Sequence, residues 1–174
     1  MGLRRVHWHL LLALLALALA RPSLPANLVG SALVLLGLAV RAWAAGFLDK
    51  SGALCAAGPY ARVRHPLYLG SFISALGFCV MMNIFWAWAL VLPLFVGLYA
   101  AQVLLEERCL RARYRDEHAR YAAQVPLLLP RFARPAAPAA PWRFALLLGN
   151  REQYHALLTL ALVALFYAKW CWRW

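Results

Sequence analysis

Two arginines and a histidine interrupt an otherwise apolar stretch of the chain in GPYARVRHPLYLG, residues 58–70. Arg62 and Arg64 could be cationic anchors whose side chains reach from a membrane interface into water. His65 is a poorer anchor, and it directly precedes Pro66, a residue favoured in the first turn of a helix because its missing N–H is not needed there. The glycine that ends the stretch would permit close approach of a helix or a ligand. Residues 58–70 therefore combine a titratable side chain with the start of a helix.

Two adjacent glutamates, Glu106 and Glu107, stand where a long apolar run ends. A carboxylate at the end of a membrane span is costly unless it is paired, so both residues are candidates for a functional site. Glu107 has a structural alternative, because Arg111 lies at the i,i+4 position of a helix. Glu106 has only Leu110 at that spacing, and we expect its face to turn into the helix bundle. The pattern favours Glu106 as the glutamate that is harder to explain by structure alone.

Two other features could take part in chemistry. Residues 113–126, RYRDEHARYAAQVP, are amphipathic, with Tyr114 and Tyr121 seven residues apart on one face of the expected helix. This helix would either dock onto anionic lipid or cover residues 58–65 as a cytoplasmic lid. Arg41 stands alone among apolar residues, where it would either reach toward the interface or bind the headgroup of a substrate.

The composition indicates a polytopic membrane protein. Of the 174 residues, 65% are hydrophobic and 14% are charged, whereas about a quarter of the residues of a soluble domain are charged. The net charge of +12 could indicate nucleic-acid binding on a soluble fold, but here the arginines lie between apolar runs, as in cytoplasmic loops of membrane proteins. The four cysteines form no CxxC pair, so we expect neither a disulfide framework nor a zinc site.

The apolar runs predict an all-α membrane bundle of about five transmembrane helices. Pro93 should kink the fourth of them. The first run also resembles a cleaved signal peptide, but the next run follows within a few residues, as in a helical hairpin, so we expect it to be retained. The five expected spans are residues 6–20, 26–47, 66–82, 84–105 and 154–167.

The charge of the loops predicts the orientation of these spans. Half of the 18 basic residues lie in residues 108–151, and the connection that precedes the third span is also basic. With a cytoplasmic N-terminus, both connections are cytoplasmic. The third and fourth spans form a hairpin, so His65 and Glu106 should lie close together. We expect three parts: an N-terminal hairpin (1–48), a core (49–131), and a Pro/Ala linker with a last helix (132–174).

The two charged segments together resemble a known family. RHPLYLG, followed about 36 residues later by EERCL and then by YAAQVP, is similar to the membrane-embedded methyltransferases typified by isoprenylcysteine carboxyl methyltransferase and the phospholipid methyltransferases. The resemblance covers roughly residues 30–131. RAWAAGFL, which precedes the motifs, also looks like the small bacterial members, which implies a bacterial inner membrane with a cytoplasmic active site. The last span and the late Arg131 depart from the pattern of the best-known members and leave the acceptor open.

This resemblance implies an S-adenosylmethionine-dependent enzyme that methylates a lipid or lipid-linked acceptor. The cofactor would lie between the RHPxYxG segment and the helix that carries the two glutamates, one of which would bind its amino or ribose groups. The residues carried over to the cofactor are Tyr60, His65, Pro66, Tyr68, Gly70, Glu106 and Glu107. The catalytic candidates are Arg64, His65 and Glu107, and the substrate-binding candidates are Arg41 and Tyr121.

The implied chemistry suits these residue types. A sulfonium methyl group is an activated electrophile, so its transfer depends more on positioning than on a strong base. A carboxylate can bind the cofactor's ammonium group, and His65 could accept a proton from an acceptor that must lose one. Two other classes stay open: a nicotinamide-dependent membrane reductase, which would need phosphate-binding basic residues, and a non-enzymatic small membrane protein.

Overall fold

The computed structural model describes residues 17–49, 52–130 and 140–172, and within these ranges it contains helices and loops but no strand. The predicted all-α class is confirmed. The elements are α2 (Leu24–Ala45), the 3₁₀ helix η1 (Gly58–Ala61), α3 (Pro66–Met82), α4 (Phe85–Gln124), α5 (Phe144–Gly149) and α6 (Glu152–Trp172).

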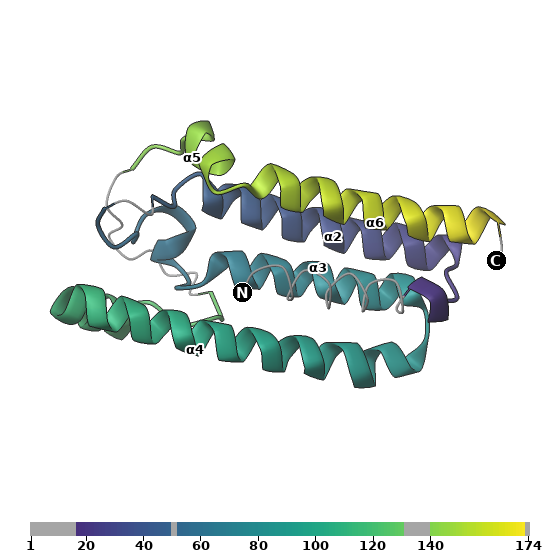
Figure 1. Ribbon diagram of the computed structural model, residues 1–174, viewed down its shortest axis with the longest axis horizontal. Helices are drawn as coiled ribbons and strands as arrows, with labels where there is room; N and C mark the ends of the chain where they lie inside the picture. The colour runs from purple at the N-terminus through teal and green to yellow at the C-terminus, as the bar shows by residue number, and fades with distance from the viewer. Residues whose placement is uncertain (1–16, 50–51, 131–139, 173–174) are drawn as a thin grey trace, which may run out of the picture.

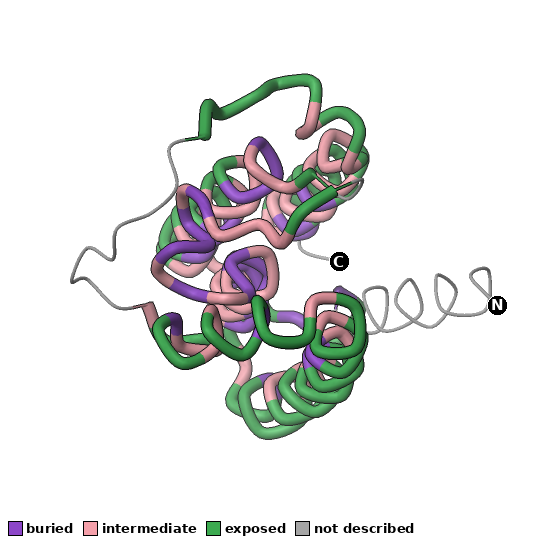
Figure 2. The backbone as a smooth tube through the Cα atoms, turned by 90° about the vertical axis from the view of Figure 1, so that its left-hand side faces the viewer, coloured by how far each residue is buried: buried purple, intermediate pink, exposed green. Residues whose placement is uncertain are grey.

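Among the described residues, three helices are long and apolar enough to cross a membrane: α2, α4 and α6. The hairpin helix α3 is also apolar but has 17 residues, slightly short of the about 20 that a span usually needs. Most of the expected first span lies outside the described residues, so the count of five spans stays a prediction. The outer faces of the helices are exposed in the end-on view of Figure 2, and they carry many leucines, which suits contact with lipid.

The helices α2 and α3 pack closely along their length through glycines. A Cβ atom at Gly77 would lie 2.6 Å from the backbone oxygen of Gly30, and one at Gly37 would lie 2.4 Å from that of Gly70. Small residues at such positions let two helix backbones approach each other. In Figure 1, α3 lies between α2 and α4, and α6 lies along α2 on the outer side. This packing fixes the position of α3 along the axis of the bundle, and therefore the position of its first residue.

The helix α4 does not run straight to its last residue. Its φ/ψ angles stay helical through Pro93, and Arg115 is the residue of α4 that leaves the helical region, with φ 38° and ψ −110°. An uninterrupted helix would separate Glu107 and His118 by about 16 Å, at about 1.5 Å per residue. In the structure, His118 Nε2 lies 3.5 Å from Glu107 Oε2. The chain therefore reverses at Arg115, and we call residues 116–126 the fold-back segment.

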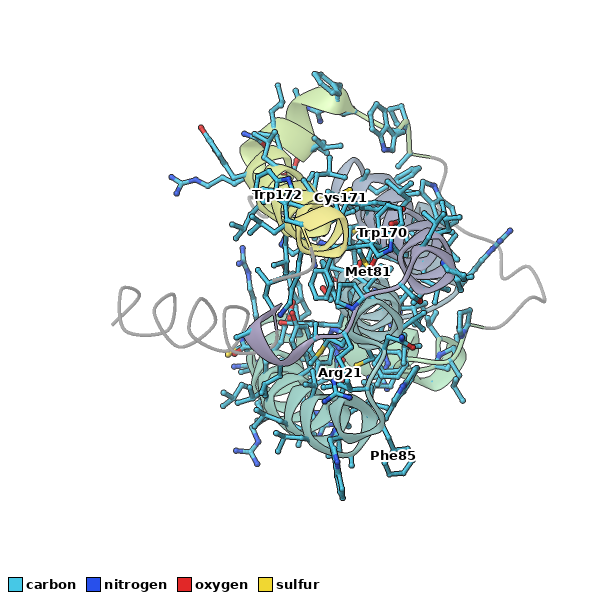
Figure 3. All side chains as sticks on the ribbon, turned by 90° about the vertical axis from the view of Figure 1, so that its right-hand side faces the viewer. Arg21, Met81, Phe85, Trp170, Cys171 and Trp172 are labelled. Carbon is cyan, nitrogen blue, oxygen red and sulfur yellow. The ribbon has the colours of Figure 1, made fainter. Side chains whose placement is uncertain are left out.

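The first and last described helical segments are tied together at the end of the bundle opposite the reversal of α4. Lys169 Nζ donates hydrogen bonds of 2.7 Å to the backbone oxygens of both Leu17 and Ala18. Phe85 and Trp172 lie on the surface of this end, as Figure 3 shows. Exposed aromatic residues of this kind are typical of a membrane–water interface. The charged motifs lie at the other end of the bundle, with η1 and the start of α3 (Figure 1).

Candidate active site

The two charged segments meet at one end of the bundle, where η1, the start of α3 and the reversal of α4 lie together (Figure 1). Residues 58–65, which we call the motif loop, contain η1 and lead into α3. His65 is the residue before the helix, with φ −123° and ψ 63°, and Pro66 takes the first helical position. The non-helical backbone of His65 directs its side chain toward α4, where it is 4% exposed.

Glu107 is the centre of the polar contacts. One of its carboxylate oxygens, Oε2, accepts a hydrogen bond from Arg64 Nη1, and the other, Oε1, lies 2.8 Å from His65 Nε2. The residue is 9% exposed. Both partners come from the motif loop, so the i,i+4 pair with Arg111 is not the arrangement that explains Glu107. Charge-assisted bonds to a buried carboxylate are among the stronger hydrogen bonds in proteins.

Glu106 is more open than the sequence suggested. Its side chain is 44% exposed, and its Oε2 lies 3.9 Å from His65 Nδ1. The predicted proximity of His65 and Glu106 is confirmed. Glu106 turns only partly toward the bundle: its carboxylate approaches His65, but Glu107, on the neighbouring face of α4, is the glutamate that is buried. Tyr68, on α3, lies close to Glu106 and Gln102 of α4.

The fold-back segment covers the motif loop. Tyr121 Oη donates a 2.7 Å hydrogen bond to the backbone oxygen of Tyr60, and Arg64 N donates one of 2.9 Å to that of Pro126. His118, in the same segment, is 1% exposed. Sequence analysis did not select His118, since a continuous helix would have carried it far from Glu107. The contacts agree with the lid interpretation of residues 113–126, although Tyr114 and Tyr121 do not share one continuous helix.

Several buried polar atoms at this site have no hydrogen-bond partner. Three of the five such side-chain atoms in the described ranges belong to it: Tyr60 Oη, Arg64 Nε and His118 Nε2. Burial raises the pKa of the Tyr60 phenol, so this hydroxyl stays protonated and can donate at neutral pH. Buried polar groups in native proteins are nearly always satisfied, which points to a ligand or ordered water beside these atoms.

Two residues predicted to contact ligands are engaged elsewhere. Arg41 donates from Nε and Nη2 to the Glu152 carboxylate at 3.0 and 2.7 Å, and from Nη1 to Ser71 Oγ at 2.6 Å. It thus ties α6 to α2 and α3. Gly70 faces α2, where a Cβ atom would lie 2.7 Å from the backbone oxygen of Gly37. The sequence predicted that Gly70 would permit close approach of either a helix or a ligand, and the structure shows the approach of the helix α2.

An apolar groove adjoins the site in the membrane-spanning part of the bundle. It has a volume of about 410 Å³ and lies between α3, α4 and α6. The ring centroids of Tyr99, which lines the groove, and Tyr68 are 5.3 Å apart, and those of Tyr68 and His65 are 5.7 Å apart. These rings connect the groove with the polar site. Residues that line its length include Ala75, Phe78, Leu90, Leu94, Phe95 and Leu162.

Comparison with known families identifies the type of protein that carries this site. The phospholipid methyltransferase family matches residues 15–117, more than half of the chain. This chain belongs to that family. The matched range contains the motif loop, α3 and both glutamates, whereas His118 and α6 lie beyond it. The resemblance inferred from RHPLYLG and EERCL is confirmed at the level of the family.

Two curated bacterial proteins are similar to this family member over 95 residues. The cobalt-zinc-cadmium resistance protein CzcN of Cupriavidus metallidurans is 32% identical, and the nickel-cobalt-cadmium resistance protein NccN of Alcaligenes xylosoxydans is 30% identical. Each match covers 53% of this chain and 44% of the relative. The chain thus matches less than half the length of either relative. No solved structure matches the chain.

Proposed function

We propose that the protein is an S-adenosylmethionine-dependent methyltransferase that acts on a lipid or lipid-linked acceptor in a bacterial inner membrane. The observation that carries the proposal is the position of Glu106, a partly exposed carboxylate beside His65 and Tyr68, at the end of an apolar groove. Membership of the phospholipid methyltransferase family supports the reaction class.

The polar residues fit the amino-acid portion of the proposed cofactor. Glu107 is already engaged by Arg64 and His65, which leaves Glu106 as the carboxylate available for an ammonium group. The unpartnered Tyr60 Oη and Arg64 Nε can donate to a carboxylate. When bound, the cofactor would supply a methyl group on a sulfonium, an electrophile that needs positioning more than activation. In this proposal Glu106 binds the cofactor and Glu107 shapes the site.

His65 can take a proton from the acceptor through a defined nitrogen. A carboxylate only accepts hydrogen bonds, so His65 Nε2 must carry the proton in its 2.8 Å contact with Glu107. In the neutral ring, Nδ1 is then the basic nitrogen, and it points to the side of Glu106. An acceptor that loses an N–H or O–H proton could release it to this atom. An acceptor without such a proton would need His65 only for position.

The groove supports an acceptor with a long apolar part. Its walls are almost entirely apolar, and its polar members, such as Ser71 and Tyr99, lie toward the site. A hydrocarbon chain in this groove would place an attached polar group beside His65 and Tyr68. The motif loop and the fold-back segment lie at the same end of the bundle, and the excess of basic residues in the connections supports a cytoplasmic position for that end.

Calorimetric titration of the purified protein with S-adenosylhomocysteine tests the proposal. We expect saturable binding that Glu106→Gln weakens by about tenfold or more, the effect of losing one hydrogen bond to a charged group. The matched control is Glu117→Gln, because Glu117 is exposed on the fold-back segment and has the same chemistry. Absence of binding by folded protein, or binding of a reduced nicotinamide nucleotide instead, would overturn the proposal and favour a reductase.

A further inference from the structure

His118 is a buried imidazole that faces the carboxylate at the centre of the site. Its Nε2 lies 3.5 Å from Glu107 Oε2 and has no hydrogen-bond partner, and the residue is 1% exposed. The residue comes from the fold-back segment, whereas the two established donors to Glu107, Arg64 and His65, come from the motif loop. His118 lies beyond the range matched by the family.

The chemistry of the contact defines which atom carries the proton. Glu107 offers only acceptor lone pairs when ionised, and its two oxygens have room for about four donors. An unprotonated Nε2 on His118 would be an acceptor facing these lone pairs and would gain no hydrogen bond. A protonated Nε2 can donate a hydrogen bond to the Glu107 carboxylate. A distance of 3.5 Å exceeds the usual 2.7–3.2 Å of such a bond by only a few tenths of an ångström. Hydrogen bonds of active sites are often long without ligand and shorten when the ligand binds.

We propose that His118 is a positioning residue that donates from Nε2 to Glu107 and completes the site when the cofactor binds. The inference rests on the proposed function, since the ligand that completes the site is the proposed cofactor. With three donors, the Glu107 carboxylate is held from both the motif loop and the fold-back segment. This contact fixes Arg64 and His65, and through His65 it fixes the space beside Glu106 where the cofactor's amino group binds.

The position of His118 also connects the fold-back segment to Glu107, the carboxylate at the centre of the site. The fold-back segment has two backbone-anchored contacts with the motif loop, from Tyr121 to Tyr60 and from Arg64 to Pro126. His118 adds the contact to the carboxylate itself. A cofactor that draws Glu107 and His118 together would hold the fold-back segment over the motif loop. This arrangement would slow release of the cofactor.

Two substitutions separate this role from simple packing. His118→Met keeps an unbranched side chain of similar size without a donor, and His118→Gln keeps an N–H donor at nearly the position of Nε2. In titrations with S-adenosylhomocysteine, we expect His118→Met to weaken binding about tenfold and His118→Gln to stay within about threefold of the unchanged protein. Tyr114→Phe is the control, because it removes the 2.9 Å hydrogen bond from Tyr114 Oη to the backbone oxygen of Gly52, and Tyr114 precedes the reversal at Arg115.

Equal weakening by both His118 variants, or no effect of His118→Met, would overturn the proposal. The tautomer provides a test that does not depend on the folding of His118→Met. Nitrogen-15 spectra of histidine-labelled protein with S-adenosylhomocysteine, assigned by the signal lost in His118→Gln, should show the proton on Nε2. A proton on Nδ1 alone would overturn the inference. Failure of the unchanged protein to bind S-adenosylhomocysteine would instead refute the proposed function.

Discussion

Replacing Glu107 by glutamine should destabilise the folded protein far more than the same replacement at Glu106. The Glu107 carboxylate accepts from Arg64 Nη1 and lies 2.8 Å from His65 Nε2; His65 is buried and Arg64 is partly buried. Glutamine has almost the same shape, but its amide presents one oxygen and one NH₂ group. One of the two partners must then face a donor, and the Arg64 guanidinium loses its counter-charge.

The size of the effect follows from the burial of the pair. The Arg64 and Glu107 side chains are 15% and 11% exposed. Removing one partner of a buried pair costs about 3–5 kcal/mol, and the remaining exposure places this pair near 3 kcal/mol. That is about a 150-fold change in the ratio of folded to unfolded protein, at about 1.4 kcal/mol for each factor of ten. Glu106 is 44% exposed, so its replacement should cost less than about 1 kcal/mol.

Reversible unfolding in mixed micelles, with increasing sodium dodecyl sulfate and tryptophan fluorescence as the probe, measures this difference. The Glu106→Gln variant is the matched control, since it changes the neighbouring residue by the same chemistry. A Glu107→Gln variant within about 1 kcal/mol of the unchanged protein would refute the assignment of Glu107 as the residue that holds the motif loop to α4. A larger loss for Glu106→Gln would refute the assignment of the two glutamates.

Three further predictions concern the backbone and the buried tyrosines. Arg115→Gly should raise the free energy of unfolding by about 1 kcal/mol, because φ 38° strains any other residue, whereas Arg113→Gly should lower it by a similar amount in the same unfolding assay. Gly77→Ala should lower it by about 2 kcal/mol, because its Cβ atom would lie 2.6 Å from a backbone oxygen of α2; unchanged stability would contradict this packing. Burial raises the pKa of Tyr60 and Tyr121, so above about pH 10 the unfolded state releases protons that the folded state keeps, and stability should fall with rising pH. Replacing both tyrosines by phenylalanine should make that fall shallower in unfolding curves recorded from pH 8 to 11, and an equally steep fall would show that neither tyrosine contributes.

Local features of the sequence determined the class of the protein, the position of α3 and the pair of motifs. Hydropathy and helix-starting residues act within a few residues, so the predicted span 66–82 agrees with α3 (Pro66–Met82). The expected last span, 154–167, lies within α6 but is shorter than it. The hairpin of α3 and α4 also predicted the proximity of His65 and Glu106, because two helices joined by a short turn return the chain to the same depth.

The tertiary structure decided which glutamate is buried, how Arg41 is used and that His118 reaches the site. Each of these depends on a contact between segments that are distant in sequence. Glu107 is buried because of the rotation of α4 against α3, Arg41 is engaged by Glu152 at a sequence separation of 111 residues, and His118 returns because the chain reverses at Arg115. Helical periodicity describes one helix at a time, so it cannot give the rotation between two helices or a reversal at a residue that is not glycine.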